Sequence, residues 1–136
     1  MTMPFSSGNR TASAGLALLL LACSARDRLT FPDLNDGEGP SVTITDPGQD
    51  TTVSAGAAAL ISGRVVDHGG IDTVYFDVQG GLSSFPPLVA NGTDTVTFSL
   101  PLTTTGLSGA TILISVYAVN LAAIHGDTAT RQVIVQ

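Results

Sequence analysis

The sequence contains no lysine and no tryptophan, and charged residues make up only 12% of its 136 residues. Typical domains carry about 25% charged residues, so serine and threonine must supply much of the polar surface here. The formal net charge is −6, and arginine is the only permanently cationic side chain. A surface this acidic repels phosphate groups, which argues against nucleic acid as a partner and against docking of the domain itself on anionic lipid.

The chain has a single cysteine, Cys23, so no internal disulfide can form. Cys23 follows a long apolar run at residues 12–22 (ASAGLALLLLA), and the start before this run carries only Arg10 as a charge. The run is too short to span a bilayer as a helix, which takes about 20 apolar residues. A positive start, a short apolar core and a small residue before the cleavage point predict an export signal over residues 1–22.

Leu20, Leu21 and Ala22 stand directly before Cys23. They resemble the lipobox of bacterial lipoproteins, which has an aliphatic residue at −3, a small residue at −1 and then an obligatory cysteine. The resemblance implies a diacylglyceryl thioether on Cys23, cleavage before it and acylation of the new amine. Because each buried methylene contributes about 0.8 kcal/mol, several chains on one residue would anchor the protein almost permanently.

The residue after the cysteine bears on localisation. Ser24 stands where an aspartate favours retention in the inner membrane of enteric bacteria. We therefore expect a lipid-anchored protein of the bacterial cell envelope, in the outer rather than the inner membrane. Residues 24–40 (SARDRLTFPDLNDGEGP) lack apolar periodicity and are rich in Asp, Gly and Pro. Residues 23–40 are thus predicted to be the lipidated cysteine and a flexible linker.

From residue 41 onward the apolar pattern has a period of two, which is typical of half-buried strands, and no segment has a helical period. Turn sequences such as Asp67-His68-Gly69-Gly70 and Asn91-Gly92 separate the strands. The predicted strands cover residues 41–45, 57–67, 71–79, 82–90, 93–100, 111–120 and 129–135. Short strands at this spacing predict an all-β fold, a seven-stranded immunoglobulin-like β-sandwich, over residues 41–136.

Four segments of this domain carry short motifs: residues 40–44 (PSVTI), 61–67 (ISGRVVD), 70–74 (GIDTV) and 112–120 (ILISVYAVN). They resemble the bacterial immunoglobulin-like domains of surface and secreted proteins, which often read P-x-V-x-I, I-x-G-x-V-x-D, G-I-x-x-V and V-x-A-x-D-x-x-G-N. The resemblance implies adhesion, spacing or ligand presentation rather than catalysis. Asn120 stands where the family usually has aspartate, so an acidic ion site does not carry over.

The candidate chemical groups are His68 and His125, together with Asp67, Asp72 and Asp127. The strand order places all five at one end of the sandwich. Imidazole and carboxylate groups can bind a divalent metal. An aspartate before Gly-Gly, however, is typical of a turn that caps backbone N–H groups. We therefore expect solvated turn residues, no metal and no cofactor.

Three functional classes remain open. The first is a non-catalytic binding, adhesion or structural module, monomeric, with a protein or glycan ligand. The second is a calcium-dependent, cadherin-like adhesion module, which would need clustered Asp and Glu ligands. The third is a small hydrolase, but no G-x-S-x-G elbow is present and a thin sandwich rarely holds a catalytic triad, so we expect no enzyme.

The strand order also predicts the polarity of the domain. Residue 41 begins at the same end as the two histidines, so the linker should enter there and that end should face the membrane. The loops at residues 46–52, 79–84 and 101–110 should lie at the opposite end, where we expect the contact surface. Tyr117 is predicted to face outward on its strand, as a structural corner residue or an exposed contact residue.

Overall fold

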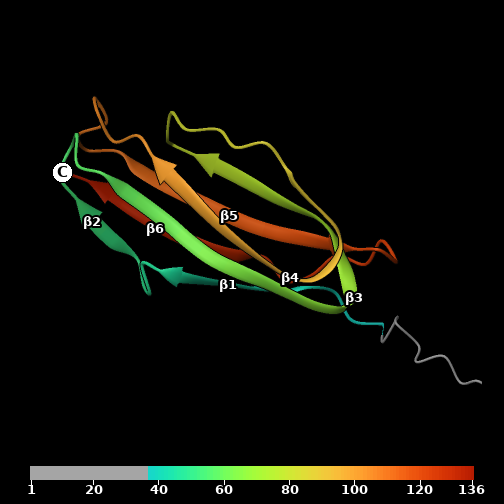
Figure 1. The fold of residues 1–136 in the computed structure, drawn as a ribbon. Coiled ribbons are helices and arrows are strands. Elements are labelled where there is room, and N and C mark those ends of the chain that lie inside the picture. The colour runs from blue at the N-terminus through green and yellow to red at the C-terminus, as the bar shows by residue number, and fades with distance from the viewer. Residues whose placement is uncertain (1–36) are drawn as a thin grey trace, which may run out of the picture. The chain divides into compact units, whose positions relative to one another are not determined.

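The structure, a computed structural model, describes residues 37–136, and this part of the chain is all-β and contains no helix (Figure 1). The predicted export signal, Cys23 and nearly all of the predicted linker lie outside the described residues. Among residues 37–136 no helix could cross a membrane. The strands are β1 (Ser41–Asp46), β2 (Thr51–Val53), β3 (Ala59–Gln79), β4 (Leu88–Leu102), β5 (Thr111–Asn120) and β6 (Ala129–Val135).

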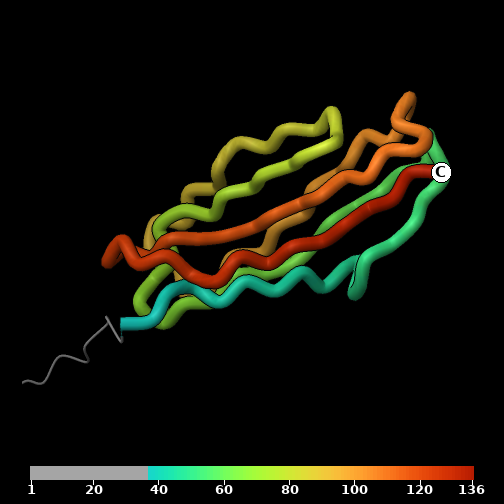
Figure 2. Tube along the Cα trace, turned by 180° about the vertical axis from the view of Figure 1, so that it is seen from behind, coloured from blue at the N-terminus to red at the C-terminus, as the bar shows by residue number. Residues whose placement is uncertain are grey.

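The six strands form one hydrogen-bonded sheet that curls over itself. Up to Val66, β3 pairs with β1 on one side and with the later part of β4 on the other. From Ile71 onward β3 pairs with β5 and with the beginning of β4. β6 continues this second layer beside β5, and β2 pairs with β6 in parallel. β3 thus contributes to both layers, and Figures 1 and 2 show it bending and running back along the molecule.

The prediction of seven separate strands differs from the six that the structure has. β3 passes through Asp67-His68-Gly69-Gly70 and β4 passes through Asn91-Gly92, although both segments were predicted as turns. The chain does bend at these places, with φ of 85° at Gly70 and 83° at Gly92. Pairing resumes in a shifted register after Val66 instead of ending, as at a β-bulge. Two predicted strands therefore merge at each bend.

Two further differences concern short segments. Residues 82–87 were predicted as part of an edge strand but are irregular, and pairing begins only at Leu88. β2 was not predicted, because residues 46–52 looked like a single turn. Its pairing with β6 joins Thr51 to Val133, two residues far apart in the sequence. A segment of three residues carries too little pattern to predict such a pairing.

The apolar side chains of the period-two pattern form the core, as such a pattern predicts. Alternate side chains of β3, β5 and β6 are fully buried, among them Ile61, Val65, Ile114 and Val133. Three phenylalanines pack together at the core, of which Phe98 is buried and Phe76 and Phe85 are partly buried. Phe76 meets Phe98 edge-on with ring centroids 5.6 Å apart and Phe85 with centroids 6.5 Å apart. Gly63, the glycine of the segment ISGRVVD, lies against the ring of Phe98.

Candidate functional site

The described chain begins at the end of the domain that carries both histidines. A Cβ atom on Gly39 would collide with the carbonyl oxygen of His125, and one on Gly126 with that of Pro40, so these segments lie in direct contact. Ser41 pairs with Val66, directly before the bend of β3. This confirms the prediction that the chain enters the domain at the end with the two histidines. The C-terminal residue lies at the other end of the domain (Figure 1).

The candidate metal ligands share this end but do not form a cluster. Asp67 points inward and is 7% exposed, and its Oδ1 accepts the N–H of Gly69 at 2.6 Å, as a turn-forming aspartate does. His68, the next residue on β3, is exposed, as is Asp127. Asp72 accepts the hydroxyl of Thr73 at 3.0 Å. Within residues 37–136 no group of three or more His, Cys, Asp or Glu residues could hold a metal ion.

Asn120 occupies the centre of this end and is 3% exposed. Its Oδ1 accepts the backbone N–H groups of Ala122, at 3.1 Å, and Ile124, at 2.9 Å. Its Nδ2 donates to the carbonyl oxygen of Glu38 at 3.0 Å. Both lone pairs of the amide oxygen are used, so this side chain holds the loop and has no free oxygen for a cation.

An aromatic row lies on the outer face of the second layer. Tyr75 and Tyr117 stand opposite each other on β3 and β5, stacked with centroids 5.0 Å apart and ring planes at 12°. His125 continues the stack, 6.3 Å from Tyr117. The prediction that Tyr117 faces outward is confirmed. Because the rings face one another, the row stabilises the sheet as a cross-strand aromatic ladder.

The predicted contact loops meet only in part. Residues 79–84 and 101–110 lie together, since Ser83 Oγ accepts the N–H of Thr103 at 2.9 Å. Residues 46–52 end short of the tip, because Asp46 stands opposite Ser62 and Asp50 binds the N–H of Gln132 at 2.9 Å. Residues 54–58, which the sequence did not single out, form the tip instead, where Ala55 donates to the C-terminal residue Gln136 at 2.7 Å.

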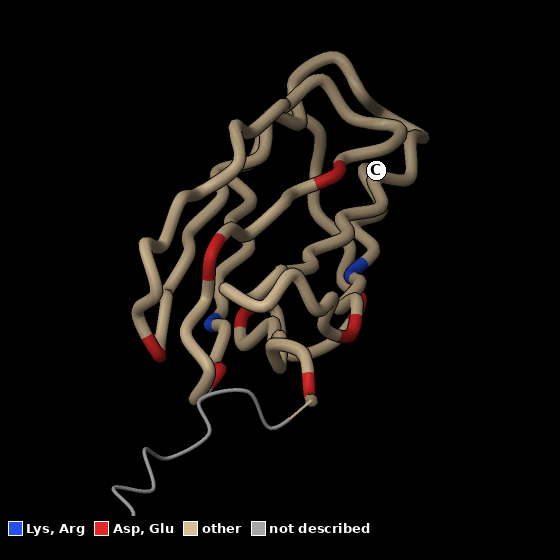
Figure 3. The backbone as a smooth tube through the Cα atoms, turned by 90° about the vertical axis from the view of Figure 1, so that its right-hand side faces the viewer, with Lys and Arg blue, Asp and Glu red and all other residues tan. Residues whose placement is uncertain are grey.

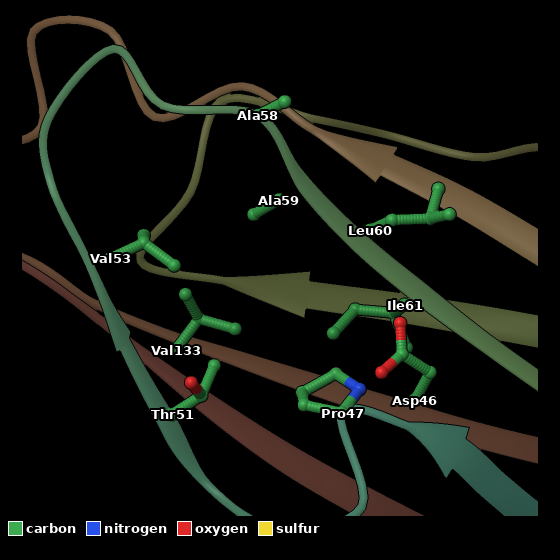
Figure 4. A pocket seen from close by; sticks show the side chains of 9 residues that line it. All are labelled: Asp46, Pro47, Thr51, Val53, Ala58, Ala59, Leu60, Ile61 and Val133. Carbon is green, nitrogen blue, oxygen red and sulfur yellow. The ribbon is translucent and has the colours of Figure 1, made fainter.

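A cavity of about 160 Å³ opens between β1 and β2, beside this tip (Figure 4). Aliphatic side chains from three strands converge on it, among them Val53, Ile61 and Val133, while Asp46 lies at its mouth. The full lining is Asp46, Pro47, Thr51, Val53, Ala58, Ala59, Leu60, Ile61 and Val133. Sequence reasoning missed this cavity, because it depends on where β1 stops and on the unpredicted strand β2.

Acidic residues outnumber basic ones along the described domain, in which Arg64 and Arg131 are the arginines and there is no lysine (Figure 3). The side chain of Arg131 lies beside the end of β1. Its Nη2 donates to the carbonyl oxygen of Ile44 at 3.4 Å, and its Nη1 lies 3.9 Å from Oδ1 of Asp50. Asp50 is largely exposed, so this ion pair is weak. Two carboxylates, those of Asp46 and Asp50, and one guanidinium, that of Arg131, thus lie near the cavity, and negative charge is in excess there.

Two curled β-layers with this strand order define an immunoglobulin-like domain. The sequence model of the bacterial Ig domain family matches residues 40–120, and the chain belongs to this family. None of the curated proteins matches the chain.

A solved structure shows the same fold. A mutant of the SrpA adhesin from Streptococcus sanguinis is 11% identical, with a TM-score of 0.50, over 71% of this chain and 57% of that chain. This protein thus spans little more than half the length of that adhesin chain. The sialic acid binding region of a Streptococcus sanguinis SK1 adhesin, bound to 3'sLn, is 14% identical over 72% of this chain and 29% of that chain, with a TM-score of 0.46.

Proposed function

We propose that the chain is a lipid-anchored, non-catalytic binding module of the bacterial cell envelope. The observation that carries this proposal is the polarity of the domain. Residues 37–40, where the chain enters the domain, are held against His125 and Gly126, and the cavity and the loops of residues 101–110 lie away from them. A domain tied at one end presents the other to a partner. Membership in the bacterial Ig domain family supports a binding role rather than catalysis.

The anchor is the first part of this proposal. Lipid on Cys23 would hold the protein in the outer membrane, with the residues between Cys23 and the packed segment 38–40 as the spacer. Mass spectrometry of the mature amino terminus should find a thioether-linked diacylglyceryl group and an acylated amine on Cys23. The Cys23→Ala variant should leave the membrane fraction. An unmodified cysteine or an uncleaved chain would contradict the anchor.

The presented end is the second part. Full-length protein in native membranes, cross-linked and purified, should capture a protein or glycan partner. Substitutions around the cavity or in residues 101–110 should reduce this capture, whereas His68→Ala and His125→Ala should not. If only the two histidine variants reduce capture, the proposed polarity is wrong.

A further inference from the structure

The edge of β3 is open beside the cavity. β1 pairs with β3 only as far as Ser62, whereas β3 continues to Ala59 and stays paired with β4 on its other side. β2, which follows β1 in the chain, pairs with β6 instead. Within residues 37–136, no strand therefore pairs with residues 59–61 of β3 on the β1 side.

The direction of the backbone groups at this edge follows from strand geometry. The carbonyl oxygen of Ser62 accepts the hydroxyl of Thr45 and so faces the β1 side. Backbone N–H and C=O groups of alternate residues face the same side of a strand, so those of Leu60 face the open edge. An exposed strand edge of this kind is a template for pairing with another extended segment.

The cavity supplies the second half of a strand-addition site. An incoming strand that pairs with Leu60 would point its neighbouring side chains inward, as Ala59 and Ile61 do on β3. A cavity of about 160 Å³ with aliphatic walls accommodates one side chain, since an apolar cavity of about 150 Å³ holds a benzene molecule. In strand addition, backbone pairing gives affinity and such a pocket gives specificity.

The charges around the mouth select the occupant. Asp50 shares its charge with Arg131, 3.9 Å away, whereas Asp46 lines the cavity and forms no ion pair with residues 37–136. A basic segment is attracted here. A second copy of this acidic chain would bring like charge, which disfavours it.

The geometry points to a peptide-binding site in which an extended segment with an aliphatic residue next to a basic one adds to the open edge of β3. The backbone of Leu60 pairs with the segment, the aliphatic side chain enters the cavity, and Asp46 attracts the basic residue. This inference rests on the proposed binding function and names the chemistry of its partner.

Fluorescence anisotropy with the full-length protein in detergent tests this site. The probes are a labelled peptide of sequence KTVTIK, the acidic peptide ETVTIE, the peptide KTGTGK without aliphatic residues, and KTVTIK methylated on alternate backbone nitrogens. We expect KTVTIK to bind, and each of the other three to bind about tenfold more weakly or not at all. Equal binding of all four peptides would overturn the site.

Paired variants locate the binding. Ala58 is exposed at the mouth of the cavity, so Ala58→Trp should close it and weaken KTVTIK about tenfold. Ala122→Trp, exposed at the other end, should not. Asp46→Lys should shift the preference toward ETVTIE, whereas Asp94→Lys, at another exposed position, should leave it unchanged.

Three other results would contradict the inference. Cross-links from KTVTIK that map to the Tyr75 and Tyr117 face would place the peptide elsewhere. Self-association of the protein that Ala58→Trp abolishes would make a second copy the occupant. Capture of an envelope partner without any binding of KTVTIK would refute the peptide site and leave the proposed function standing.

Discussion

Asn120 at the end of β5 donates a hydrogen bond from Nδ2 to the carbonyl oxygen of Glu38, at 3.0 Å. This bond joins the first described residues of the chain to the far end of the fifth strand. The same amide holds the loop after β5 through the N–H groups of Ala122 and Ile124. One side chain thus fixes both the point where the chain joins the domain and the loop that carries His125.

Asn120→Ala should lower the free energy of unfolding by about 2–3 kcal/mol, because three backbone groups lose their partner at a buried site. Asn120→Asp keeps both acceptor bonds but turns a carboxylate oxygen toward the carbonyl oxygen of Glu38. Because a buried, unpaired charge costs several kcal/mol, this variant should lose at least as much as Asn120→Ala at neutral pH. Chemical denaturation of the two variants checks this. A loss in Asn120→Asp well below that of Asn120→Ala would contradict a donor bond from this side chain to Glu38.

Gly63 explains why the motif I-x-G-x-V needs a glycine. A Cβ atom there would collide with the carbonyl oxygen of Thr43 and lie 2.6 Å from Cζ of Phe98. Gly63→Ala should therefore cost about 2–3 kcal/mol, as overpacking of a core does. Gly48→Ala is the matched control, since only Thr45 O lies near it, at 3.9 Å, and it should change stability by less than about 0.5 kcal/mol. A stable Gly63→Ala variant would show that β1 can move.

The alternation of small aliphatic residues was sufficient to predict the two-layered fold and its interior. Ile61, Val65 and Val133 stand at alternate positions of the period-two apolar pattern, and all three are fully buried. Burial depends on which face of a strand a residue occupies, and the period of two encodes that face directly. The entry of the chain into the domain beside the histidines was predicted from the order of the strands.

The candidate cavity could not be predicted, because it depends on pairing between segments far apart in the chain. Nothing local to Thr51–Val53 shows that this segment leaves β3 and pairs with β6. The prediction that strands end at Gly70 and Gly92 was wrong for a related reason. A glycine with positive φ fits a tight turn and a bulged, continuous strand equally well. Tertiary pairing decides between the two.

The stacked pair of Tyr75 and Tyr117 should contribute to stability beyond the surface that it buries. In a double-mutant cycle with alanine at both positions, we expect a coupling energy of about 0.5–1.5 kcal/mol. The same cycle between Tyr75 and His125, which the structure does not place in contact, should give a smaller value. Equal coupling energies would contradict the order of the stack.

Asp67 provides a test of the calcium-dependent alternative. Its Oδ1 accepts the N–H of Gly69, whereas its Oδ2 is buried and receives no hydrogen bond from residues 37–136. Asp67→Asn keeps the acceptor and removes a buried charge, which costs several kcal/mol when unpaired. We therefore expect the variant to match the wild type or to gain about 1 kcal/mol in a metal-free buffer.

Thermal unfolding with and without millimolar calcium completes this test. If Asp67 carries an uncompensated charge, calcium should shift neither the wild type nor Asp67→Asn, and the exposed control Asp72→Asn should behave as the wild type does. If calcium binds Oδ2, it should raise the Tm of the wild type and not that of Asp67→Asn, because binding to the folded state stabilises it by mass action. The second pattern would make the domain a calcium-dependent module, even though Asn120 has no free oxygen for the ion.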